Sequence, residues 1–70
     1  MATNYTAVIQ QSGDWWIGWV EELAGVNSQG RTREELLDNL RDALDEVLEL
    51  NRAEARAAAA GSYEEVSLAL

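Results

Sequence analysis

The spacing of apolar residues along this chain changes near residue 30. Before that point, residues 5–11 and 15–22 are short runs rich in β-branched and aromatic side chains, and a Ser-Gly-Asp turn signal separates them. A third and weaker run covers residues 26–29. After it, apolar residues recur every three or four positions, which is typical of an amphipathic helix. The pattern therefore predicts an antiparallel hairpin, a short third strand and then a helix.

The helix is predicted to cover residues 33–60. Thr32 is suited to cap its first turn through the side-chain hydroxyl, and Glu35 is placed to reach back to the N–H of Thr32. Gly61 is a favourable residue just beyond a helix end. The apolar residues form a stripe wide enough to cover one face of a sheet: Leu36, Leu37, Leu40, Ala43, Leu44, Val47 and Leu48.

The predicted helix is longer than the predicted strands, and this affects where the C-terminal segment lies. At 1.5 Å per residue the predicted helix is about 40 Å long, whereas strands of seven or eight residues span about 25 Å. The alanine-rich half of the helix therefore overhangs the sheet, or the helix breaks near Asn51. Alternation resumes in residues 63–70, which predicts a further strand. If the helix is unbroken, this strand starts far from the others, and we hypothesise that it pairs with another subunit.

The second predicted strand is apolar on both faces. Trp15, Ile17 and Trp19 share one face, and Trp16 and Val20 share the other. A single helix covers only one face of a sheet, and a 70-residue domain without cysteine has few other means of stabilisation. We therefore expect a homo-oligomer. The residues assigned to its interface are Trp16, Val20, Val66, Leu68 and Leu70, and those assigned to partner contact are Asp14, Trp16, Glu21 and Glu22.

Charge narrows the class of partner. The chain has 13 acidic residues against 5 basic ones, all arginine, and a formal net charge of −8. Such a surface repels nucleic-acid phosphates and anionic membranes, and it favours a basic protein partner. The alternative is that the acids only maintain solubility. With no apolar run of about 20 residues and no signal-peptide pattern, a cytoplasmic location is expected.

Catalytic side chains are scarce. Histidine and cysteine are absent, so the usual general base and the soft metal ligands are missing. Adjacent acids such as Glu34 and Glu35 suit the first turn of a helix better than an ion site. Gly25 and Gly30 allow a phosphate-binding loop, but acids in the following helical turn would repel the anion, so tight turns are the favoured interpretation. We expect no enzymatic activity, cofactor or metal.

Two stretches form a recognisable pattern, DWWIGWVEELAG at residues 14–25 and QGRTREELLDNLRDAL at residues 29–44. Together they resemble the HicB-like antitoxin family, in which an aromatic strand enters P-E-L-x-G and a short strand ending in glycine precedes T-x-E-E-A-x-x-N-x-x-E-A. The ungapped similarity covers residues 5–50. Departures are Glu21 and Ala24 where the family often has proline, Val26 where it often has cysteine, and Leu36 where it often has alanine.

The resemblance implies an α+β fold, a partial RNase-H-like β-β-β-α core with an additional C-terminal strand, forming one domain over residues 1–70. It also implies a non-enzymatic protein that forms dimers or tetramers and masks a small basic RNA-cleaving toxin of the HicA type. Full-length family members usually carry a C-terminal DNA-binding domain, and this chain ends at Leu70 without one, so direct operator binding is not expected. The alternative function is an orphan self-assembling interaction or adaptor module. A degenerate carboxylate-dependent nuclease is the third and weakest option.

Overall fold

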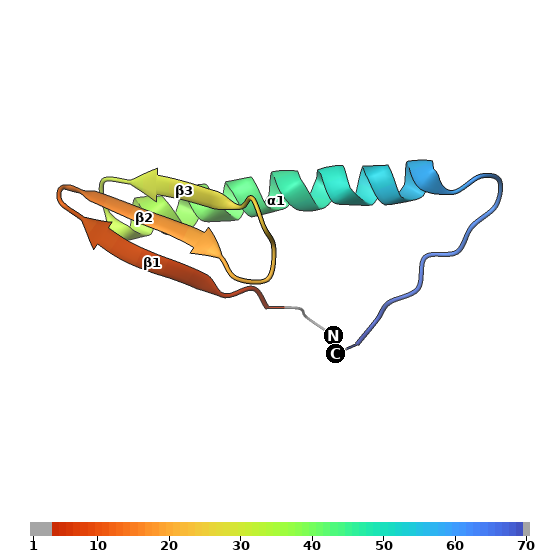
Figure 1. Ribbon diagram of the computed structural model, residues 1–70, viewed down its shortest axis with the longest axis horizontal. Coiled ribbons are helices and arrows are strands. Elements are labelled where there is room, and N and C mark those ends of the chain that lie inside the picture. The colour runs from red at the N-terminus through yellow and green to blue at the C-terminus, as the bar shows by residue number, and fades with distance from the viewer. Residues whose placement is uncertain (1–3, 70) are drawn as a thin grey trace.

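The computed structural model describes residues 4–69, which form a three-stranded sheet and one long helix (Figure 1). The elements are β1 (Ala7–Ser12), β2 (Trp15–Val20), β3 (Asn27–Gly30) and α1 (Arg33–Ala58). Both strand pairs are antiparallel and the order in the sheet is β1-β2-β3. The predicted α+β arrangement of three strands followed by a helix is therefore confirmed.

The register of the strands decides which side chains share a face. Ile9 lies opposite Gly18 in β1–β2, and Ser28 lies opposite Gly18 in β2–β3. A Cβ atom added at Gly18 would lie 3.0 Å from Ile9 Cγ2 and 3.1 Å from Leu40 Cδ1 of the helix. Gly18 therefore marks the helix side of the sheet. Because side chains alternate along a strand, Trp16 and Val20 share that side.

The core lies between α1 and the sheet at the N-terminal half of the helix. The helix packs on β2 and β3. The buried apolar residues are Val20, Val26, Leu36 and Leu40, and Leu36 is completely inaccessible. The rest of the predicted apolar stripe, from Ala43 to Leu48, is only half-buried because it extends beyond these strands.

The start of α1 is held close to the sheet. The Thr32 hydroxyl accepts a hydrogen bond from the Glu35 N–H at 3.1 Å, as the N-cap prediction required. The Asn39 side chain donates to the Gln29 carbonyl of β3 at 2.8 Å. A Cβ atom at Gly30 would lie 2.7 Å from the Leu36 backbone nitrogen. Gly30 therefore allows a close approach of two backbones, and the predicted tight-turn role belongs to Gly25, whose φ is +86°.

Helix α1 is continuous through Asn51 and overhangs the sheet, as Figure 1 shows. Its 26 residues correspond to about 39 Å of helix. The molecule measures 51 × 22 × 16 Å, and its radius of gyration is 15.2 Å. A compact domain of 70 residues would have a radius of gyration of about 11 Å. Of the two alternatives drawn from length, the structure shows the overhang and not a break near Asn51, and the overhang makes the single chain strongly elongated.

Residues 63–69 form no regular element in the single chain, so the predicted strand at residues 63–70 is not formed there and its pairing with another subunit stays a prediction; Leu70 lies outside the described residues. After α1 the chain turns at Gly61, whose φ is +84°, and continues as an extended segment that stands away from the helix (Figure 1). A strand needs the hydrogen bonds of a neighbouring strand. Figure 1 shows the segment returning from the overhang toward the N-terminal side of the chain, but in the single chain residues 63–69 pair with no strand.

Candidate interaction site

The side of the sheet opposite α1 carries no covering element from residues 4–69 (Figure 1). We call this surface the open sheet face. Trp15 and Trp19 of β2 are 37% and 42% exposed there, and Ile17 between them is half-buried. By alternation and register, the face consists of Val8, Gln10, Ser12, Trp15, Ile17, Trp19, Asn27 and Gln29.

The chemistry of the open sheet face suits a protein partner. Its centre is aromatic and aliphatic, and its edges carry amide side chains that both donate and accept hydrogen bonds. The Arg31 guanidinium lies 4.4 Å from the Trp15 ring centroid, within range of a cation–π interaction. None of the strand residues on this face is acidic. Tryptophan and arginine are the residue types most often found at interaction hot spots.

The structure does not bring the four predicted partner-binding residues together. Asp14 lies in the turn that precedes β2, whereas Glu21 and Glu22 lie in the turn that follows it. A six-residue strand separates these turns by about 20 Å. Trp16 lies near the first turn but on the helix side of the sheet. The four residues therefore belong to different surfaces.

The predicted interface residues of β2 lie on the covered side of the sheet. Val20 is only 7% exposed and is part of the core beneath α1, and Trp16 is half-buried on the same side. Their burial within one chain leaves Val20 little surface to offer a second one. A sequence signal for this was available. Gly18 lies between Trp16 and Val20, and a glycine inside a strand often marks the side that another element approaches closely.

Glu22 has a structural contact in this chain. Its Oε1 atom accepts a hydrogen bond from the Thr6 N–H at 2.7 Å, just before β1 begins. The hydrogen bond from the Thr6 backbone lowers the pKa of Glu22 below its ordinary value of 4.5, because it stabilises the ionised carboxylate. In the same place the Glu21 N–H donates to the Thr6 carbonyl at 2.9 Å. These bonds hold the start of β1 against the end of β2.

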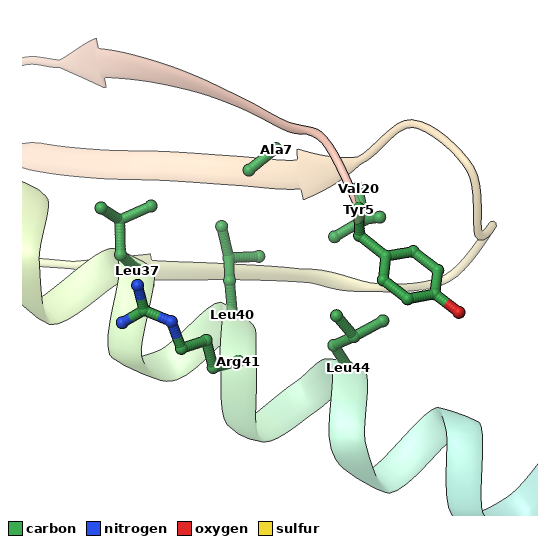
Figure 2. A pocket seen from close by; sticks show the side chains of 7 residues that line it. All are labelled: Tyr5, Ala7, Val20, Leu37, Leu40, Arg41 and Leu44. Atoms are coloured by element: carbon green, nitrogen blue, oxygen red, sulfur yellow. The ribbon is translucent and has the colours of Figure 1, made fainter. Parts of the chain in front are cut away.

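A groove runs between β1 and α1 at the edge of the sheet (Figure 2). We call it the β1 groove. Its volume is about 160 Å³ and it is mainly apolar, with the Arg41 side chain at its rim. It exists because α1 packs on β2 and β3 and leaves the helix side of β1 uncovered. The lining residues are Tyr5, Ala7, Val20, Leu37, Leu40, Arg41 and Leu44. No short sequence pattern indicates this groove.

The C-terminal segment 63–69 exposes the apolar residues that were assigned to the interface. Val66 is 70% exposed and Leu68 is 89% exposed, and Tyr63 is 53% exposed. The Glu65 carboxylate lies 3.6 Å from the Arg56 guanidinium in the last turn of α1. In the single chain these exposed side chains therefore gain little of the stabilising free energy that burial would provide.

The described residues contain no group of three or more acidic side chains that would hold a metal ion. They also include no helix that is both long and apolar enough to cross a membrane. Comparison with models of protein families, with curated proteins and with solved structures found no match.

Proposed function

We propose that this protein is a non-enzymatic interaction module that assembles with copies of itself. The observation that supports the proposal best is its accessible surface of 5678 Å². A compact monomer of 7.7 kDa would expose about 4,300 Å². The excess exceeds the area of about 800 Å² that one partner contributes to a standard interface. A chain with this much surplus surface gains stability when another chain covers it.

The surplus surface is also apolar at defined places. The open sheet face, the β1 groove and the segment 63–69 each expose aliphatic or aromatic side chains. Meanwhile, only four hydrophobic side chains are buried in the described part of the single chain. A domain of this size without disulfides is marginal on such a core. Association is therefore the means by which we propose that the fold becomes stable.

A second proposed function is the masking of a basic RNA-cleaving toxin of the HicA type, as the family resemblance implies. The exposed side of α1 favours such a partner. Near its middle lies a shallow, open hollow lined by Leu50 and three acids, Asp45, Glu46 and Glu49. Leu50 is 63% exposed there. Acidic groups around an exposed apolar side chain complement a basic protein surface. In this proposal the chain is the partial RNase-H-like core of an oligomeric antitoxin.

The native mass in solution tests the first function. Sedimentation equilibrium of the purified chain should give a multiple of 7.7 kDa at micromolar concentration. Replacing Trp15 and Trp19 by serine should lower that mass or weaken the association, because both residues lie on the open sheet face. Glu54→Gln, on the exposed helix overhang, is the control and should leave the mass unchanged. A well-folded 7.7 kDa monomer for the unmodified chain would contradict the proposal.

The toxin proposal needs a separate assay. Any small basic protein encoded beside this gene would be co-expressed with the chain, and its RNA cleavage would be measured with and without the chain. Stoichiometric loss of cleavage is the expected result. Undiminished cleavage, or the lack of any such neighbouring protein, would leave self-assembly as the function of the module.

A further inference from the structure

We infer that residues 63–69 of one copy form a fourth strand beside β1 of a second copy, with Val66 and Leu68 in the β1 groove. This inference rests on the proposed self-assembly and adds to it the segment and the surface that meet. In a symmetric dimer each copy would donate one segment and accept another.

The acceptor is the free edge of β1. The sheet order β1-β2-β3 leaves β1 with a neighbour on one side only. An edge strand presents unpaired backbone N–H and C=O groups, and these pair readily with an extended segment. No proline or charged side chain lies within Ala7–Ser12 to block such pairing.

The groove explains why a strand at this edge would be buried on one side. A strand placed beside β1 points alternate side chains toward α1, since β1 itself directs Ala7 there. Figure 2 shows Leu37, Leu40 and Leu44 of α1 directed from the helix toward the sheet. These leucines provide apolar contacts that a fourth strand would complete.

The segment 63–69 has the matching pattern. Val66 and Leu68 lie two residues apart, so a strand directs both to the same side, and Ser67 between them points to the other. Glu64 falls on the side of Val66 and Leu68, and the Arg41 guanidinium lies at the rim of the groove. The spacing of Val66 and Leu68 therefore matches the apolar lining of the groove, and the charge of Glu64 is opposite to that of Arg41 at its rim.

The length of α1 indicates why the donor is a second copy. Glu65 lies beside Arg56, in the last turn of the helix. From Arg56 back to Leu44, at the end of the groove, the helix measures about 18 Å. Residues 66–69 span only about 13 Å when fully extended. While Glu65 stays beside Arg56, residues 66–69 therefore stop short of the groove of their own chain, whereas a second copy can place all of residues 63–69 there.

The test uses the absence of cysteine from the chain. One variant carries Ala7→Cys and the other carries Leu68→Cys, and equal amounts are mixed, unfolded, refolded together and oxidised. We expect a disulfide-linked product of twice 7.7 kDa that contains one copy of each variant. Replacing Leu68→Cys by Ser67→Cys, which points to the opposite side, should give much less product. A chain with both Ala7→Cys and Leu68→Cys that closes only an internal disulfide would overturn the inference.

A second measurement does not depend on cross-linking. Because Val66 and Leu68 are exposed in the single chain, Val66→Asp with Leu68→Asp should not impair its folding. We expect the pair to raise the dissociation constant of the oligomer by at least about tenfold, and Ser67→Asp to raise it less than about threefold. If the unmodified chain is monomeric, the proposed self-assembly fails as well. If it is oligomeric and the pair changes nothing, the strand exchange alone is wrong.

Discussion

The role of Glu22 in the fold differs from the role that the sequence predicted for it. In the sequence it is one of two adjacent acids and a candidate for partner contact. In the fold its Oε1 accepts the Thr6 N–H at 2.7 Å and closes the open end of the β1–β2 pair. An acceptor for an otherwise free backbone donor is a structural role. The other predicted contact residue of that turn, Glu21, contributes its backbone N–H to the same junction.

The lowered pKa of Glu22 gives a prediction for stability against pH. A carboxyl whose pKa is lower in the folded than in the unfolded state stabilises the fold above its unfolded value, near 4.5, and this contribution is lost as pH falls through the folded value. Glu22→Gln keeps an acceptor oxygen but removes the charge. The stability difference between the unmodified chain and this variant should be constant near neutral pH and shrink below about pH 4.5.

Urea unfolding followed by tryptophan fluorescence, repeated at several pH values, measures that difference. Glu21→Gln removes one charge from the same turn and controls for the general effect of net charge. A difference that persists unchanged to pH 3, or that is absent at neutral pH, would show that the charge of Glu22 does not strengthen its hydrogen bond with Thr6.

At the scale of elements, the junction of β3 and α1 determines the geometry of the fold. Thr32 fixes where the helix begins, and Asn39 bonds the helix to the Gln29 carbonyl. The backbone nitrogen of Leu36 lies so close to Gly30 that a Cβ there would be 2.7 Å away. This close approach buries Leu36 completely and directs the helix along the sheet. The rest of the helix, from Ala43 onward, follows that direction beyond the strands.

Gly30→Ala should therefore destabilise the protein by about 2 kcal/mol or more, because an added methyl group would meet helix backbone that has no room to shift. Gln29→Ala, on the open sheet face of the same strand, is the matched control and should change the free energy of unfolding by less than about 0.5 kcal/mol. Chemical denaturation followed by circular dichroism measures both. Equal stability of the Gly30→Ala variant and the unmodified chain would refute the tight helix–strand contact.

At the scale of the whole molecule, shape and charge have opposite effects on association. The elongated chain exposes apolar surface that favours contact between copies, yet each copy has a formal charge of −8, so copies repel one another. A basic partner would meet no such repulsion. The two proposed functions therefore differ in their response to salt, because salt screens repulsion and attraction alike.

Raising the salt concentration from about 20 to 300 mM should strengthen self-association by about threefold or more, because the Debye length falls below the separation of many surface charges. Binding of a basic toxin should weaken over the same range. Sedimentation of the chain alone, and of the chain with the toxin, measures the two trends. Self-association that weakens with salt would show that charge pairing rather than apolar contact joins the copies.

Much of the fold was predictable because its signals are local. Turn residues after β1, the cap at Thr32 and the three- and four-residue spacing of leucines depend on neighbours a few positions apart. Length alone limited the helix to an overhang or a break near Asn51, since the rise per residue differs between helix and strand. The candidate surfaces were less predictable. The β1 groove joins β1 to the middle of α1, and no short stretch of sequence contains both.

What the sequence by itself determined was thus the order of the elements, the start of the helix, its excess length and the presence of two apolar faces on β2. Only the tertiary structure decided that the helix covers the face of Val20, Gly18 and Trp16, leaving Trp15 and Trp19 open. Alternation separates two faces without saying which one is covered, because that depends on where a distant helix finds room. Residues 63–69 are a second example: their alternation predicts a strand, but a strand forms only where another strand lies beside it.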